Sequence, residues 1–191
     1  MEYLIFQLQA PMSAWGDTAV GEYRPTANYP SESALIGLLG AALGLDRAEE
    51  LRHQSLATEL RFAIGVQSSG RLLRDYHTAQ VPGRVQLKNR PHRTRRDELD
   101  IPKEDLNTIL STRDYRQEMA CLIAIQTTPE ATLQLSELAQ AIQQPKFVLY
   151  LGRKSCPPSV PLWPQILEAA NVLRAMEMYR EKLGSKSGEQ Q

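Results

Sequence analysis

The positions of apolar and polar residues along the chain predict four strands. Residues 3–9, YLIFQLQ, are a short apolar run typical of a buried strand. Residues 60–66 have a similar character, and residues 118–126 are apolar on both faces, as in a strand that is covered on both sides. Residues 146–151 form the last apolar run. These four segments are the predicted strands of the core.

Helical patterns occur between these strands. Residues 33–44, SALIGLLGAALG, are small and apolar, and Ser31 or Ser33 is a suitable N-cap for a helix here. Residues 136–144 predict a second helix, capped by Ser136 and ended by the proline that follows. The predicted order of elements is therefore βαββαβ.

This order predicts an α+β domain over residues 1–162 with the ferredoxin-like topology of RNA-recognition motifs. Such a sheet buries one face under two helices and leaves the other available to a ligand. About fifty residues connect the two middle strands. That is far more than a hairpin turn needs, so the insertion is predicted to be functional or mobile. Residues 163–191 predict an amphipathic helix, to about residue 183, followed by a polar, disordered tail.

The overall charge is neutral, but its distribution is not even. The chain has 191 residues, enough for one good core, and contains 22 basic and 22 acidic residues. This balance argues against a uniformly basic nucleic-acid-binding surface. Residues 84–96, however, contain six Lys or Arg and no acid, and residues 97–105 contain five acids. The pattern suits a subunit that meets RNA locally and other proteins elsewhere.

Cysteine usage and hydropathy narrow the class of protein further. Cys121 and Cys156 are the two cysteines, with no CxxC pair and no Cys/His cluster at metal-ligand spacing, so neither a zinc site nor a disulfide framework is expected. The first residues do not have the pattern of a secretory signal, and no apolar run approaches 18 residues. The sequence predicts a soluble, cytoplasmic protein without a metal or cofactor.

Three motifs carry candidate chemistry. The loop after the first strand, PMSAWG followed by RPTANYPS, combines an aromatic ring, permissive glycines and a fixed charge in Trp15, Gly16 and Arg24, which is typical of a binding loop. The second motif is LRDYHT at residues 73–78, and the third is YLGRKSCP at residues 150–157.

These stretches, together with GLLGA in the predicted first helix, resemble the CRISPR-associated CasD family from the N-terminus to about Pro161. The resemblance implies the subunit of the type I-E Cascade surveillance complex that holds the 5′ handle of the guide RNA. It implies as partners the CasC backbone, the large subunit CasA and, through the complex, target DNA. It also implies a β-hairpin thumb at about residues 76–116. The chain departs from the family at its C-terminus, where family members usually continue further and add strands.

The candidate RNA-binding residues follow from the motifs and from the basic segment. They are Trp15, Arg24, Tyr76, His77, Arg84, Lys88, Arg90, His92, Arg93, Arg153, Lys154 and Ser155. Several of them have an alternative structural role: Trp15 can cover the sheet edge instead of stacking on a base, Arg24 and Arg153 can be ordinary surface charges, and the basic segment can be a solvated arm.

Two other functions remain open at this point. Tyr76, His77, Lys88 and His92 are the residue types that metal-independent RNA cleavage requires, and a related branch in type I-C systems processes guide RNA with a Tyr, Lys and His set. The type I-E branch is regarded as non-catalytic, so an endoribonuclease is the alternative hypothesis. A protein-only scaffold that never contacts RNA is the third.

Overall fold

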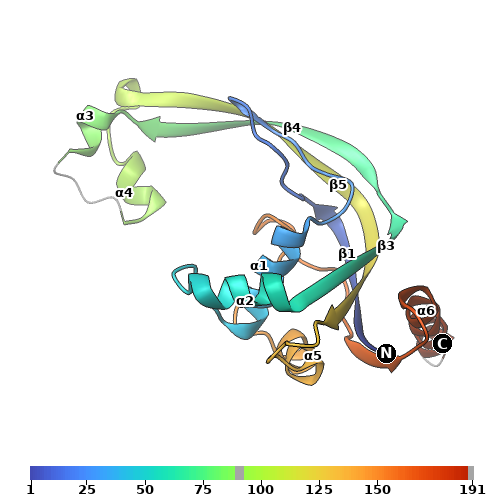
Figure 1. Cartoon of the computed structure of the whole chain (residues 1–191). Coiled ribbons are helices and arrows are strands. Elements are labelled where there is room, and N and C mark those ends of the chain that lie inside the picture. The colour runs from blue at the N-terminus through green and yellow to red at the C-terminus, as the bar shows by residue number, and fades with distance from the viewer. Residues whose placement is uncertain (89–92, 189–191) are drawn as a thin grey trace.

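The computed structural model describes residues 1–88 and 93–188, and within these ranges one sheet of six strands is organised around the long strand β5 (Figure 1). The strands are β1 (Glu2–Ser13), β2 (Tyr23–Arg24), β3 (Leu60–Ser68), β4 (Arg71–Pro82), β5 (Leu106–Thr127) and β6 (Gln165–Glu168). The helices are α1 (Glu32–Leu43), α2 (Glu50–Glu59), α3 (Arg84–Leu87), α4 (Arg95–Leu99), the 3₁₀ turn η1 (Lys103–Asp105), α5 (Leu135–Gln143) and α6 (Val172–Gly188). The fold is therefore mixed α/β with a single open sheet.

β5 is long because its two halves pair with different strands. Its second half lies between β1 and β3, both antiparallel to it, and β6 pairs with the other edge of β1. Its first half pairs with β4 from Pro82↔Leu106 to Arg71↔Gln117, and with the short parallel strand β2. Figure 1 shows β4 and this half of β5 extending away from the body, with α3 and α4 at the far end. We call this antiparallel pair, residues 71–82 and 106–117, the hairpin.

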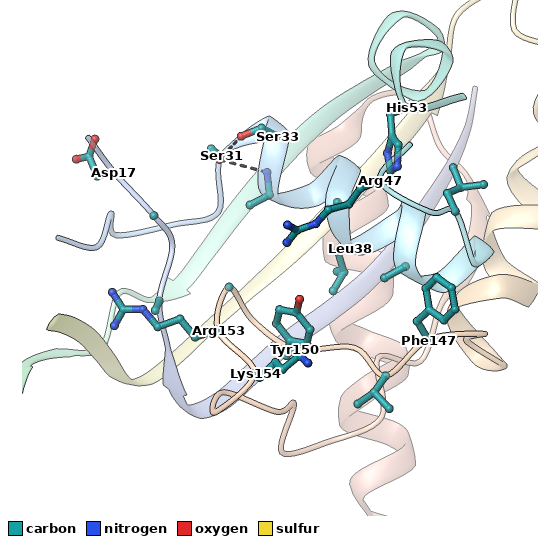
Figure 2. A pocket seen from close by; sticks show the side chains of 18 of the residues that line it. Asp17, Ser31, Ser33, Leu38, Arg47, His53, Phe147, Tyr150, Arg153 and Lys154 are labelled. Atoms are coloured by element: carbon teal, nitrogen blue, oxygen red, sulfur yellow. Dashed lines mark hydrogen bonds between the residues drawn. The ribbon is translucent and has the colours of Figure 1, made fainter. Parts of the chain in front are cut away.

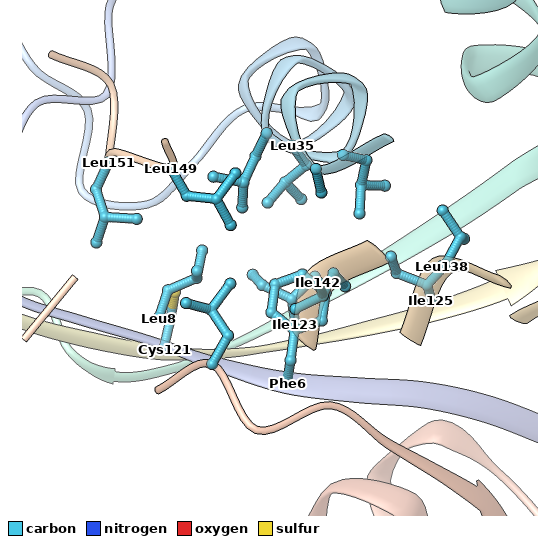
Figure 3. Packing of buried hydrophobic residues seen from close by; sticks show 14 of the residues in the cluster. Phe6, Leu8, Leu35, Cys121, Ile123, Ile125, Leu138, Ile142, Leu149 and Leu151 are labelled. Atoms are coloured by element: carbon cyan, nitrogen blue, oxygen red, sulfur yellow. The ribbon is translucent and has the colours of Figure 1, made fainter. Parts of the chain in front are cut away.

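Core residues pack on both faces of the sheet around β1 and the second half of β5. On one face, Phe6, Ile123 and Ile125 pack under α1 and α5, as Figure 3 shows. On the other face, Ile5 and Leu122 pack against Ala175, Met176 and Tyr179 of α6. The expectation of a sheet with one open face is therefore wrong here, because α6 covers it. The alternation of Leu4, Phe6 and Leu8 with Tyr3 and Ile5 between the two clusters explains why this strand is apolar throughout.

The predictions for the first two helices agree with the structure except for one cap. Ser31 is the N-cap of α1, since its side chain accepts a hydrogen bond from the amide of Ala34, and Gly44 ends the helix in the left-handed conformation at φ 76°. The predicted cap Ser136 lies instead inside the first turn of α5, whose N-cap is Gln134 without a side-chain hydrogen bond.

The predicted strand at residues 146–151 is absent, although Leu149 and Leu151 are buried in the alternating manner of a strand. The reason lies in the backbone. The amides of Lys146 and Phe147 donate to carbonyls in the last turn of α1, so the segment completes the C-terminus of that helix instead of a sheet ladder. Its leucines still reach the core, above the sheet in Figure 3.

The edge strand of the sheet comes from a later segment. Residues 163–183, predicted as one helix, contain β6 and the start of α6. The tail predicted to be disordered continues α6 through Gly188, while residues 189–191 lie outside the described ranges. A short strand of four residues has too few positions for its alternation to be distinguished from a helical pattern.

Candidate nucleic-acid interface

A cavity of about 1080 Å³ lies between the N-terminal loop, α1 and the segment at residues 147–154. Two of the three sequence motifs therefore meet here, although more than a hundred residues separate them in the chain. Figure 2 shows Arg153 and Asp17 toward one end of the cavity, Phe147 toward the other, and Tyr150 and Arg47 between them. The polar side chains that line it are Asp17, Arg24, Ser31, Ser33, Asp46, Arg47, His53, Tyr150, Arg153 and Lys154.

The motif YLGRKSCP forms a tight loop with its charged residues at the tip. The amide of Leu151 donates to the carbonyl of Cys156 at 2.7 Å, and the amide of Cys156 donates to the carbonyl of Arg153 at 2.8 Å. Gly152 has φ 90°, and a Cβ at this position would stand 1.8 Å from the carbonyl oxygen of Ala14. The loop is therefore pressed against the N-terminal loop at a point where only glycine fits. Lys154 and Ser155 are exposed at its tip.

The N-terminus of α1 opens into the same cavity. Ser31, Ser33 and Gly37 line it, so the first turn of the helix lies at its wall, with the Ala34 amide already bonded to Ser31 Oγ. A helix of 12 residues places a partial positive charge there. Amides and dipole together favour an anion such as a phosphate.

Fixed charges add to this preference. Four basic residues line the cavity together with the carboxylates of Asp17 and Asp46: Arg24, Arg47, Arg153 and Lys154. Arg47 was not among the sequence-based candidates, because a single arginine in the polar link after the first helix has no motif around it. Phe147 was also missed, since it lay in a segment predicted as a buried strand. It is 45% exposed and provides an apolar surface at the other end of the cavity.

The two motif arginines are held by backbone carbonyls. Arg153 donates from Nη1 to the carbonyl of Asp114 at 3.2 Å and from Nη2 to the carbonyl of Arg24 at 3.3 Å, and its guanidinium stands 4.5 Å from the centre of the Tyr115 ring. Arg24 donates from Nη1 to the carbonyls of Gly21 and Tyr23 at 2.6 and 3.0 Å. Both are thus preorganised at the wall of the cavity. Lys154, by contrast, has no hydrogen-bond or ion-pair partner within the described residues.

Asp114 lies next to this wall and is 2% exposed. It accepts hydrogen bonds from Arg74 Nε at 2.9 Å and from the Tyr23 hydroxyl at 2.5 Å, and Arg74 Nη2 also donates to that hydroxyl at 2.8 Å. The hydrogen bond from Arg74 lowers the pKa of Asp114, against the opposing effect of burial. The hydrogen bond to Asp114 is the largest of the causes that raise the pKa of Tyr23. Asp114 is therefore ionised at neutral pH.

Trp15 has a structural role in this conformation, not the base-stacking role considered for it. Its side chain is 2% exposed and belongs to the core under α1 and α5. The backbone around it folds back on itself, with the Trp15 amide donating to Thr26 Oγ1 and the Ala27 amide donating to the Trp15 carbonyl. The ring cannot stack on a base without leaving the core.

Tyr76 and His77 lie on the hairpin and point to opposite faces of it, because they are adjacent in β4. Tyr76 is 66% exposed, and His77 Nδ1 stands 3.7 Å from Asp75 Oδ2. Lys88 follows α3, beyond the end of β4, and the strand from His77 to Pro82 alone spans about 17 Å. The described candidates for RNA cleavage do not converge on one site, and His92 lies outside the described residues.

The described part of the basic segment lies at the end of the hairpin. Arg84 is in α3, Lys88 follows it and Arg93 precedes α4, and all three are exposed. Arg90 lies outside the described residues. Figure 1 shows α3 and α4 far from the body, so these charges form a second basic region separate from the cavity.

In residues 1–88 and 93–188, no group of three or more His, Cys, Asp or Glu side chains has an arrangement that would hold a metal ion. No helix in the same ranges is both long enough and apolar enough to cross a membrane.

Comparison with known proteins gives consistent matches. The profile of a family described as CRISPR-associated protein (Cas5) matches residues 3–188. The chain is 35% identical over 187 residues to the CRISPR system Cascade subunit CasD of Escherichia coli strain K12, covering 93% of this chain and 76% of that protein.

Solved structures give the same result. A chain of a CRISPR RNA-guided surveillance complex matches with a TM-score of 0.63 and 30% identity, and a crystal structure of a Cas protein matches with a TM-score of 0.58 and 28% identity. The matches cover 91% and 92% of this chain and 66% and 69% of the other two. This chain therefore spans about two thirds of the length of these solved relatives, and it belongs to the CRISPR-associated Cas5 protein family.

Proposed function

We propose that this chain is the Cascade subunit that binds and caps the 5′ handle of the CRISPR guide RNA and does not cut it. The observation that carries the proposal is the cationic cavity, which two of the family-like motifs build together. A CasD-like subunit of a surveillance complex must hold one end of an RNA. The cavity contains groups that bind RNA phosphates, namely helix amides, guanidinium groups and a free lysine.

The two ends of the cavity suit different parts of the RNA. Arg153, Lys154 and the first turn of α1 are placed to bind phosphates at one end, and the exposed ring of Phe147 offers a surface on which a base can stack at the other. The cavity volume of about 1080 Å³ is large enough for a few nucleotides. The site therefore fits a short terminal segment of single-stranded RNA better than a duplex.

The hairpin supports a second contact. Its strands carry few buried side chains and its end carries Arg84, Lys88 and Arg93, which suits a thumb that reaches between nucleotides. The antiparallel order β6-β1-β5-β3, with α1 and α5 on one face, is also what the ferredoxin-like, RNA-recognition-motif class predicts. Because α6 covers the opposite face, we place the RNA at the cavity and the hairpin rather than on the open sheet face.

The proposed function also implies which molecules this chain contacts in the complex. We infer that the CasC backbone and the large subunit CasA are the protein neighbours, that target DNA is met only through the complex, and that the complex acts in the cytoplasm. The globally neutral charge agrees with a protein that contacts RNA at local basic regions and proteins elsewhere.

The experiment is binding of the full chain to guide RNA with and without its 5′ handle. We expect the handle to strengthen binding at least tenfold and the affinity to fall as salt rises. Equal affinity for both RNAs would contradict handle recognition. Cleavage of repeat RNA by the wild type without metal, lost on His77→Ala with binding retained, would favour the endoribonuclease instead.

A further inference from the structure

One buried carboxylate joins three segments that meet beside the cavity. Asp114 lies in the middle of β5, where β4 pairs on one side and β2 on the other. Its side chain accepts hydrogen bonds from Arg74 of β4 at 2.9 and 3.2 Å and from Tyr23 of β2 at 2.5 Å. A charged group that is 2% exposed and fully engaged in this way fixes the relative positions of its partners.

The strand β2 is short, and the ring of Tyr23 also contacts Arg74, whose guanidinium stands 5.2 Å from the ring centre. The strand contains two residues, and its ladder with β5 is supported by the amide of Thr112, which donates to the carbonyl of Glu22 at 3.0 Å. The loop before it is exposed, with Val20 at 72%. The Tyr23 hydroxyl is thus a principal anchor of this loop on the hairpin.

The anchored backbone in turn holds the cavity arginines. Arg24, the residue after Tyr23, lines the cavity, and its carbonyl accepts a hydrogen bond from Arg153 at 3.3 Å. The carbonyl of Asp114 itself accepts the other hydrogen bond from Arg153, at 3.2 Å. A displacement of β2 would therefore remove one of the two acceptors that orient Arg153.

We propose that Tyr23, Arg74 and Asp114 form a latch that fastens β2 to the base of the hairpin and thereby positions Arg24 and Arg153 for RNA. The proposal rests on the proposed function of the cavity. None of the three latch residues was a sequence-based candidate, and the latch residues act through the two arginines rather than on the RNA. They are positioning residues.

The first test measures binding of handle RNA to the full chain carrying Tyr23→Phe, which removes one hydroxyl and leaves the ring. We expect binding to weaken roughly twofold to tenfold. Tyr29→Phe is the matched control, since Tyr29 is 52% exposed, does not line the cavity and has no hydroxyl partner within the described residues. In a background that carries both Arg24→Ala and Arg153→Ala, Tyr23→Phe should change binding less than twofold, because both residues that it positions are gone. Equal losses in both backgrounds would overturn the proposal.

The second test needs no RNA. Amide hydrogen exchange at Thr112 should become about threefold to tenfold faster in Tyr23→Phe and in Asp114→Asn, because the bond to Glu22 opens more often when β2 is released. Unchanged exchange in both variants would overturn the latch. If wild-type protein fails to bind handle RNA, the proposed function fails, and the exchange measurement still decides whether the latch holds β2.

Discussion

Arg153 and Lys154 are neighbours at the tip of one loop, but the structure gives them different roles, and alanine substitutions should separate these. Arg153 makes two hydrogen bonds to backbone carbonyls and stacks on Tyr115, whereas Lys154 is exposed and makes no ion pair within the described residues. Arg153→Ala should therefore reduce both stability and RNA binding. Lys154→Ala should reduce RNA binding alone.

The expected loss of stability follows from the contacts that Arg153 makes. Two hydrogen bonds at about 0.5–1.5 kcal/mol each and a cation–π contact at about 0.5–1 kcal/mol predict a loss of roughly 2–3 kcal/mol for Arg153→Ala. For a chain of this length that corresponds to a fall in Tm of about 4–12 °C. An exposed residue without such contacts changes the free energy of unfolding by about 0.5 kcal/mol or less, so Lys154→Ala should shift the Tm by less than about 2 °C.

The assays are thermal unfolding and titration of handle RNA at several salt concentrations. Each variant should reduce the slope of log affinity against log salt by about 0.7, the value for one phosphate contact with a single strand. Lys182→Ala is a matched control, because Lys182 is exposed on α6, away from the cavity. Equal Tm losses in Arg153→Ala and Lys154→Ala would refute the reasoning, as would salt slopes identical to wild type in both.

Three further outcomes are expected. Cys121 and Cys156 are buried, and burial raises the pKa of Cys121 to about 12, so a thiol reagent should label them at neutral pH only after denaturation; rapid labelling of folded protein would show the core to be wrong. Gly152→Ala should lower the Tm and displace the loop, because its Cβ would meet the carbonyl of Ala14 at 1.8 Å; a variant as stable as wild type, with unchanged RNA binding, would disprove this close approach. Since the pKa of Asp114 is lowered on folding, its ionised form stabilises the protein above the unfolded pKa of about 4 and this stabilisation is lost as the pH falls through the folded value. Denaturant unfolding should show wild type and Asp114→Asn converging below about pH 4, and a constant difference down to pH 2 would contradict the assignment.

The sequence predicted correctly those segments whose backbone hydrogen-bond partners match the structure that their local apolar pattern favours. The first strand and α1 were recognisable because their apolar residues are continuous and Ser31 is a good cap. The prediction of a strand at residues 146–151 was wrong, although Leu149 and Leu151 are buried like strand residues, because the backbone of the segment forms hydrogen bonds with α1. An alternation of buried residues does not reveal the hydrogen-bond partners of the backbone.

The candidate site was predictable only where a motif marked it. Arg24, Arg153 and Lys154 lay in motifs and line the cavity. Arg47 and Asp114 had no local signal, since the first lies in a polar link and the second in a mixed polar and aromatic stretch whose partners come from distant strands.

The measurement that tests the central claim most directly is photo-crosslinking of guide RNA to this chain within the assembled complex, with the crosslinked peptides and nucleotides identified together. The proposed function predicts that nucleotides of the 5′ handle crosslink to residues 14–33 and 147–154, the segments that line the cavity. Crosslinks confined to the target-pairing part of the guide, or none from the handle to this chain while other subunits crosslink to it, would contradict the claim.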